Sequence, residues 1–184
     1  ALLGASDIYE GAGQVFNLET YDGGSAWYGW ELFNNSTKKS FKLFSWGHGY
    51  NGQLGLNSQT TRSSPTQVPG TTWHVLADSG VSVTYAAAAV KSDGTLWIWG
   101  NPSEGGDFLG LLGPSIQTTR SSPIQIPGTT WADVQKGMKS FYATKTDGTL
   151  WAWGDNNRAT LGQNNKTNYS SPIQIPGAWA VGES

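Results

Sequence analysis

Two carboxylates beside an aromatic residue form the part of this sequence best suited to chemistry. Glu104 and Asp107 flank the pair Gly105-Gly106, and Phe108 follows directly. Two neighbouring carboxylates can bind a cation, or divide the acid and base steps of a hydrolysis between them. They can equally be solvated or partner-facing side chains of an irregular loop. We expect Glu104, Asp107 and Phe108 to contact a partner or ligand, because function concentrates where a loop departs from the local pattern.

Tryptophan is unusually frequent, with 10 residues, and an exposed indole ring can stack on a sugar. Trp97 and Trp99 lie two residues apart, as do Trp151 and Trp153, so each pair shares one face of a strand. Because the pairs recur in phase, we predict that they pack between structural units.

Trp27 and Trp30 fall outside this regular spacing. We expect these two aromatic residues at a surface, where they would contact a protein partner or a glycan. Loss of glycan binding on replacing either one would identify a lectin.

Residues for nucleophilic or metal chemistry are sparse. The chain has no cysteine, and its two histidines, His48 and His74, lack the spacing of metal ligands. Residues 47–52 fit the pattern G-x-G-x-x-G, but no helical pattern follows, so we reject a dinucleotide site. We predict no catalytic residue, no metal and no cofactor, and therefore a protein that is not an enzyme.

Composition limits the classes of partner. Charged residues make up 13% of the 184 residues, and the formal net charge is −2. Nucleic-acid binding needs a clustered basic face, which this chain lacks. The longest apolar stretch, residues 81–90, is too short and too polar to cross a bilayer. We predict neither a nucleic-acid nor a membrane partner.

A repeat supplies the framework that positions these residues. Residues 92–100 (SDGTLWIWG) return as 146–154 (TDGTLWAWG), and residues 40–47 (SFKLFSWG) are a weaker copy. The last tryptophans of the three copies are 53 and then 54 residues apart. A second phrase recurs in step at residues 63–70, 121–128 and 170–177, each of the form SSPxQxPG. A period near fifty residues indicates one supersecondary unit that is stacked repeatedly.

Each period contains the signals of four short strands. In the third unit, residues 130–136, 140–145 and 149–153 alternate in polarity, with Asp147-Gly148 suited to a type I′ hairpin turn. A fourth strand, 172–175, is bounded by prolines, which favours the edge of a sheet. Four strands per period indicate a propeller blade.

The predicted fold class is therefore all-β, with about three four-stranded, propeller-like blades. The N-terminal segment, residues 1–41, includes a divergent first half-blade, and residues 42–184 hold the clear repeats. Closed propellers have about four to eight blades, so three form an incomplete ring that oligomerisation or a partner would complete. The predicted blades cover approximately residues 12–70, 71–128 and 129–177, and residues 178–184 would begin another.

The repeated phrases resemble the regulator of chromosome condensation repeat family of β-propellers. The resemblance covers about residues 40–180 and includes the phrase NGQLGLN at 51–57, which returns in degraded form at 161–164. The second unit departs from the family pattern at residues 101–114. The founding member is an exchange factor for a small GTPase, with seven closed blades and basic chromatin-binding surfaces that this chain lacks.

The Thr-, Asn- and Ser-rich style of the repeats is similar to segments of bacteriophage virion proteins and bacterial surface proteins. From this resemblance we expect a non-enzymatic structural or adhesion protein, a tail or capsid-surface component located in the virion. Its expected partners are copies of itself, other virion proteins and a surface glycan. The alternatives are a lectin-like propeller, a guanine-nucleotide exchange regulator and, last, a hydrolase that uses Glu104 or Asp107.

Overall fold

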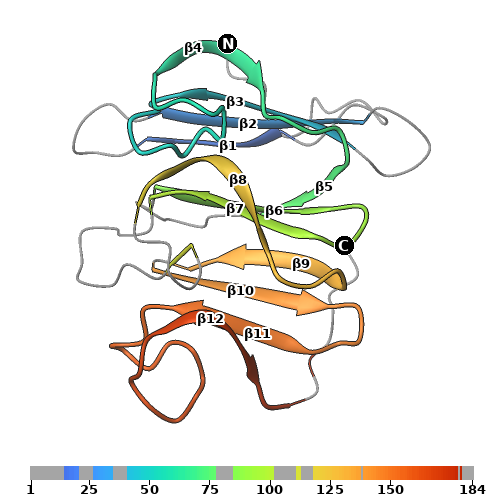
Figure 1. Cartoon of the computed structure of the whole chain (residues 1–184), viewed down its shortest axis with the longest axis vertical. Helices are drawn as coiled ribbons and strands as arrows, with labels where there is room; N and C mark the ends of the chain where they lie inside the picture. The colour runs from blue at the N-terminus through green and yellow to red at the C-terminus, as the bar shows by residue number, and fades with distance from the viewer. Residues whose placement is uncertain are drawn as a thin grey trace.

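Strands alone make up the regular structure in the described part of the chain (Figure 1). The computed structural model describes residues 15–20, 27–34, 41–77, 85–101, 111–112, 118–137, 139–177 and 179, the first two ranges as backbone only. The strands are β1 (Val15–Thr20), β2 (Trp27–Asn34), β3 (Phe41–Gly47), β4 (Arg62–Gln67), β5 (Trp73–Leu76), β6 (Ala86–Lys91), β7 (Leu96–Gly100), β8 (Arg120–Ile126), β9 (Trp131–Lys136), β10 (Ser140–Lys145), β11 (Leu150–Gly154) and β12 (Tyr169–Ile175).

Successive strands pair antiparallel in three groups of four. The first blade is β1–β4, the second is β5–β8 and the third is β9–β12. In the third blade, for example, Tyr142 of β10 lies opposite Gln135 of β9 and Ala152 of β11. The prediction of an all-β fold with three four-stranded, propeller-like blades is confirmed, while the exact limits of the repeats stay a prediction.

The fourth strand of each blade lies at an edge. The edge strands β4, β8 and β12 pair only with β3, β7 and β11 respectively, within the described residues. They carry Pro65, Pro123 and Pro172. The residues of a central strand donate their N–H groups alternately to the two neighbouring strands, and proline has no N–H to donate. This explains why the strand that carries proline is the outer one.

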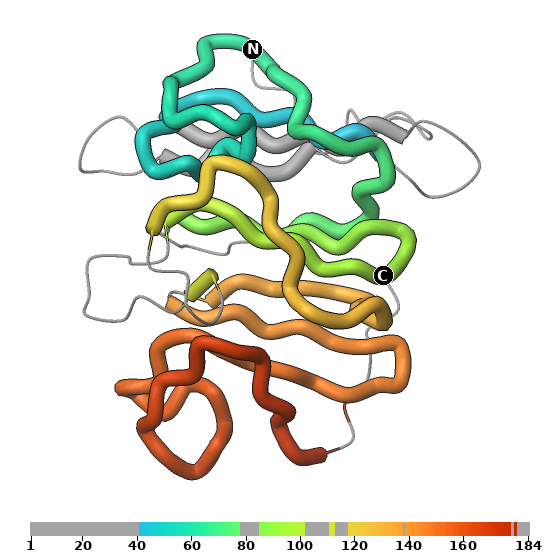
Figure 2. The backbone as a smooth tube through the Cα atoms, in the orientation of Figure 1, coloured from blue at the N-terminus to red at the C-terminus, as the bar shows by residue number. Residues whose placement is uncertain are grey.

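The blades are stacked one on another along the chain (Figure 2). A single pair, Phe41 opposite Trp73, links β3 to β5 and joins the first two blades into one eight-stranded sheet. The third blade is a separate four-stranded sheet. We call the contact between the first and second blades the first junction, and that between the second and third the second junction.

Glycine sets the hairpin turns between the second and third strands of the repeats. Gly94 has φ +78° and Gly148 has φ +79°, whereas neither preceding aspartate has positive φ. The amide of Gly94 donates to the carbonyl of Lys91, and Lys91 donates to Thr95. This is a three-residue loop with glycine in the left-handed position, so the predicted type I′ turn is wrong.

The core of the protein lies between blades. At the first junction the buried residues are Leu43, Val68, Trp73, Leu76, Ala89 and Trp99. A larger cluster, with Trp131, Phe141 and Trp153 as its aromatic members, fills the second junction. Each blade therefore buries one sheet face against its neighbour, as stacked repeats do.

The described chain continues past the third blade to Trp179, which belongs to no strand. The start of a fourth blade predicted at residues 178–184 lies otherwise outside the described residues. None of the described residues forms a helix that could span a membrane.

Candidate functional site

Each junction is fastened by a tryptophan of the later blade. The indole Nε1 of Trp99 donates to the carbonyl of Gln53 at 2.8 Å, and that of Trp153 donates to Leu111 at 3.1 Å. Both acceptors precede a fully buried leucine in the loop between the third and fourth strands of the earlier blade. Both tryptophans are themselves fully buried, which confirms the prediction that the repeat-phased Trp99 and Trp153 are packing residues.

Close approach of the backbone makes this fastening possible. Gly55 follows the buried Leu54, has φ +68°, and a Cβ on it would lie 2.8 Å from the indole nitrogen of Trp99. Only glycine combines this backbone conformation with this contact.

A hydrogen-bonded relay orders Trp97 in the second blade, and the same relay orders Trp151 in the third. Trp97 donates its indole N–H to the hydroxyl of Thr95 at 2.7 Å, and that hydroxyl donates to Asp93 at 2.6 Å. The backbone N–H of Thr95 also donates to the same carboxylate oxygen. The hydrogen bonds from Thr95 lower the pKa of Asp93, and the equivalent bonds from Thr149 lower the pKa of Asp147.

A lysine lies over two indole rings at each junction. The Nζ of Lys91 is 4.0 Å from the ring centroid of Trp97 and 4.8 Å from that of Trp73. Lys145 repeats these two distances over Trp151 and Trp131. Burial lowers the pKa of Lys91, against the opposing effect of Asp93. The indole faces therefore hold a partly desolvated ammonium group in place.

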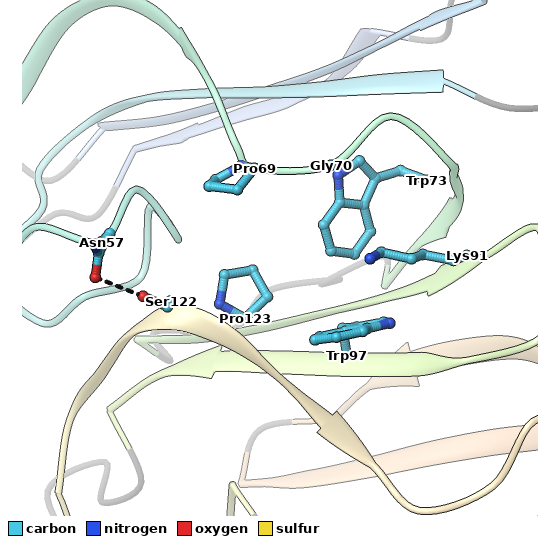
Figure 3. A pocket seen from close by; sticks show the side chains of 8 residues that line it. All are labelled: Asn57, Pro69, Gly70, Trp73, Lys91, Trp97, Ser122 and Pro123. Carbon is cyan, nitrogen blue, oxygen red and sulfur yellow. Dashed lines mark hydrogen bonds between the residues drawn. The ribbon is translucent and has the colours of Figure 1, made fainter.

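A pocket of about 430 Å³ opens beside Lys91 at the first junction (Figure 3). Its apolar wall consists of Trp73 and Trp97 with Pro69 and Pro123, which come from both blades. Figure 3 shows the ammonium end of Lys91 lying between the two indole rings and pointing toward the space beside Pro123. Lys91 is the one charged residue that lines this pocket.

The far side of the pocket is polar. The hydroxyl of Ser122 donates to Asn57 Oδ1 at 2.8 Å, and the backbone N–H of Asn57 donates to Ser121 at 2.7 Å. Asn57 has φ +55° and an exposed side chain. Because its Oδ1 is occupied, Asn57 offers its amide N–H groups to the solvent.

The outer face of the third blade has no blade against it in the described structure. Ala152, Leu161 and Ile175 form a small buried cluster there, with Tyr142, Leu150 and Tyr169 packed on it. Trp179 is 41% exposed, whereas Trp73 and Trp131, which follow the same Pro-Gly phrase in the other repeats, are 0% and 3% exposed.

The acceptor at this face is occupied from within the blade. Thr160 precedes the buried Leu161 and corresponds to Gln53, the acceptor of the Trp99 indole. The hydroxyl of Tyr142 donates to the carbonyl of Thr160 at 2.9 Å. A tyrosine of the same blade thus satisfies the carbonyl that a following blade's tryptophan satisfies at the two junctions.

The predicted contact residues are not brought together by the described structure. Trp27 and Trp30 are in β2, opposite Thr20 and Phe16, and their side chains lie outside the described part of the chain. Glu104, Asp107 and Phe108 lie outside the described residues altogether. Their roles stay predictions.

Sequence reasoning missed Lys91 and Asn57 at the pocket, and Lys145 over the indole rings of the third blade. A signal was present for the lysines: Lys91 and Lys145 each precede the phrase [ST]-D-G by one residue. No group of three acidic, histidine or cysteine residues among those described could hold a metal ion.

A known repeat family matches two segments of the chain. The family model described as "Regulator of chromosome condensation (RCC1) repeat" matches residues 42–88 and 147–179. The first matched segment runs from β3 into β6, and the second runs from the hairpin before β11 to the end of the described chain. In these two segments, which are less than half of the 184 residues, the chain is similar to RCC1 repeats.

Two plant proteins are similar in sequence. The "RCC1 domain-containing protein RUG3, mitochondrial" of Arabidopsis thaliana is 40% identical over 91 residues, which are 46% of this chain and 18% of that protein. The "Ultraviolet-B receptor UVR8" of the same plant is 29% identical over 121 residues, 64% of this chain and 26% of that one. The chain thus spans about a fifth to a quarter of these relatives.

Solved structures support the fold. Prp20p of Saccharomyces cerevisiae, described with its binding to Gsp1p and histones, superposes with a TM-score of 0.62 at 16% identity, over 82% of this chain and 36% of that one. The same yeast protein bound to Kap60 gives a TM-score of 0.56 at 19% identity, over 83% of this chain and 36% of that one. At these identities the likeness establishes an RCC1-like propeller arrangement and nothing finer.

The expected virion location is wrong. The expectation came from the Thr-, Asn- and Ser-rich style of the repeats, but the relative with 40% identity is a mitochondrial protein of a plant, which points to a cellular location. Repeat style reflects turn and surface composition, and fold-level analogy does not fix where a protein acts.

Proposed function

We propose that this chain is a non-enzymatic protein-binding module, an incomplete propeller whose open blade faces associate with a protein. In the simplest case that protein is a second copy of the chain. The observation that carries the proposal is the exposure of Trp179, because the tryptophans that follow the same phrase are buried wherever a blade covers them. An exposed tryptophan beside an apolar cluster is typical of an interaction surface.

The two open faces are complementary. Trp46 of β3 occupies the position of Trp99 and Trp153, the tryptophans that fasten a blade to the one before it. Its indole N–H makes no hydrogen bond to the described residues. The carbonyl of Thr160 on the third blade is the matching acceptor, and a carbonyl oxygen can accept a second hydrogen bond beside that from Tyr142.

If two copies associate head to tail, the contact between Trp46 and Thr160 would form twice, once at each contact between the copies. Trp46 of each copy would reach Thr160 of the other, and Trp179 would be covered by the first blade of the other copy. The result is a ring of six blades, which falls within the range of about four to eight found in closed propellers. The two contacts between the copies would be identical, as closed symmetric assemblies require.

The relatives support protein binding in a cellular setting. Prp20p is described with Gsp1p, histones and Kap60 as binding partners, and all three are proteins. These partners belong to Prp20p, and the chain covers 36% of its length. They favour a protein over a sugar as the class of partner, and they leave regulation of a GTPase as the alternative activity.

Trp27, Trp30, Glu104, Asp107 and Phe108 remain the contact residues that we propose beyond the blade faces. Trp27 and Trp30 are in the first blade, so a partner that covers its open face could reach them. A surface glycan remains the alternative ligand for the same two tryptophans.

The mass of the chain in solution tests the proposal. Sedimentation velocity should show a concentration-dependent species at twice the 19.7 kDa of one chain. Trp46→Ala and Trp179→Ala should each shift this species to one copy. Tyr50→Ala is the matched control, because Tyr50 is the other large exposed aromatic residue in the described structure. It lies in the loop between β3 and β4, which is hydrogen-bonded to the second blade through Asn57. A single copy at every concentration, or equal effects of all three variants, would refute self-association.

A further inference from the structure

The pocket at the first junction holds a lysine whose ammonium group has neither a hydrogen bond nor an ion pair with the described residues. Lys91 Nζ lies over the rings of Trp73 and Trp97 and makes no hydrogen bond or ion pair within the described residues. Asp93, the carboxylate that acts on it, accepts two hydrogen bonds from Thr95 in the hairpin turn. The three N–H groups of the ammonium are therefore available to a ligand, and the indole rings restrict where they can point.

The lining of the pocket selects against sugar stacking. A sugar stacks on a free aromatic face, but the ammonium of Lys91 lies over the faces of Trp73 and Trp97 that border the pocket (Figure 3). What the pocket presents is an ammonium group between indole rings, with Pro69 and Pro123 beside it. That combination suits a carboxylate carried next to an apolar group.

The polar side of the pocket suits a peptide backbone. The amide N–H groups of Asn57 are donors, and donors match the carbonyl oxygens of an extended chain. Walls of proline and tryptophan are the type of surface on which extended peptide segments dock. A volume of about 430 Å³ accommodates a short segment and not a folded element.

We propose that this pocket binds an acidic, extended segment of a partner protein, with an Asp or Glu side chain on Lys91 and its apolar neighbour against Pro69 and Pro123. The site is independent of the open blade faces, so its failure and the failure of ring closure can be told apart. Burial already disfavours the charge of Lys91, and an incoming carboxylate would offset that effect.

Fluorescence anisotropy with labelled peptides on the full chain tests the proposal. The probe is a peptide of alternating Pro and Glu, and its matched control alternates Pro and Gln. We expect the Glu peptide to bind about tenfold more tightly than the Gln peptide, because a hydrogen bond to a charged group is lost in the second. Free glutarate should compete poorly, since it lacks the backbone and the apolar neighbour.

Variants locate the binding to the pocket. Lys91→Met should weaken binding of the Glu peptide about tenfold, whereas Lys166→Met makes the same change of charge at an exposed loop position and should not. Asn57→Asp provides a second test at an exposed position, since its carboxylate would repel the acidic peptide and weaken its binding. Equal loss in Lys91→Met and Lys166→Met, or no difference between the two peptides, would overturn the proposal.

Discussion

The outer face of the second blade and the outer face of the third blade are the same surface of the repeat with different side chains. The outer face of the second blade is covered by the third blade and belongs to the largest buried cluster. The outer face of the third blade has no blade against it in the described structure. The two faces differ at three equivalent positions of the second strand, which is β6 in the second blade and β10 in the third. Ala86, Ala88 and Val90 of β6 are replaced in β10 by Ser140, Tyr142 and Thr144.

The difference shows how a repeat is adapted to being uncovered. Each change adds a hydroxyl group, and Ser140 and Tyr142 are linked to each other and, through Tyr142, to the carbonyl of Thr160. These hydroxyl groups make the outer face of the third blade more polar than the equivalent face of the second. Leu150, Ile175 and Trp179 keep the apolar character of the repeat, so the face tolerates water and can still take a partner.

The largest expected difference in stability is between a variant of Trp99, at the first junction, and a variant of Trp179, at the outer face of the third blade. Trp99→Ala deletes a fully buried ring and leaves the carbonyl of Gln53 without its donor, so we expect a loss of about 3–5 kcal/mol of stability. Trp179→Ala removes a partly exposed ring and should cost the single chain about 1 kcal/mol or less. Urea unfolding followed by circular dichroism measures both.

Both unfolding measurements belong at a protein concentration where one copy predominates, since ring closure would add stability to the chain that retains Trp179. Similar losses in the two variants would mean that the third blade's face is covered as fully as the junctions are.

Alanine substitutions at two equivalent glycines compare the packing at the first junction with that at the outer face of the third blade. Gly55 and Gly162 have φ of +68° and +63°, and each follows a fully buried leucine. Alanine at either position incurs the left-handed penalty of about 1–2 kcal/mol. At Gly55 the new Cβ would also lie 2.8 Å from the Trp99 indole, whereas at Gly162 it meets an isoleucine methyl at 3.3 Å. We expect Gly55→Ala to cost about 1–3 kcal/mol more than Gly162→Ala in thermal unfolding. Equal costs would show that the indole moves aside freely.

The regular part of the fold could be predicted from sequence because it depends on local rules. The strand at residues 140–145 was predicted with its observed limits, since alternation and a Gly turn determine it. The last strand was predicted to begin at Pro172 and begins at Tyr169, because a register shift lets Tyr169 pair with Gly154. No alternation pattern encodes such a shift.

The candidate site could not be predicted from the sequence, because it depends on contacts between residues of different strands and blades. Lys91 meets Trp73 because the two residues are opposite each other in β5 and β6. The bond from Tyr142 to Thr160 joins residues 18 positions apart and depends on one departure from the repeat, a tyrosine in place of alanine. The repeats predict the strand order that the blades share, whereas single substitutions within a repeat determine how the face of one blade differs from that of another.

A substitution at Thr144 should increase stability by a small amount, in contrast to the losses expected above. Its hydroxyl is buried without a hydrogen-bond partner among the described residues, and the equivalent position in the covered blade is Val90. Thr144→Val should raise the free energy of unfolding by up to about 1 kcal/mol, because an unsatisfied buried hydroxyl is removed at nearly constant shape. Thr144→Ser keeps the hydroxyl and loses the methyl group, so it should bring no gain. A loss of stability in the valine variant would mean that the hydroxyl binds water or a partner.

Acid should affect the two blades alike and by the smallest amount, because the hairpin relay is the same in both. The pKa values of Asp93 and Asp147 are lowered from the ordinary 3.8 by the hydrogen bonds from Thr95 and Thr149. The folded chain therefore releases these protons more readily than the unfolded chain, and stability that is fully present above 3.8 is lost as the pH falls through and below that value. Asp93→Asn and Asp147→Asn keep an acceptor for the threonine without the titration, so each should flatten the acid limb of unfolding midpoint against pH by a similar small amount. If only one variant flattens it, the relay differs between the blades, and the contrast between a covered and an uncovered face extends into the hairpins themselves.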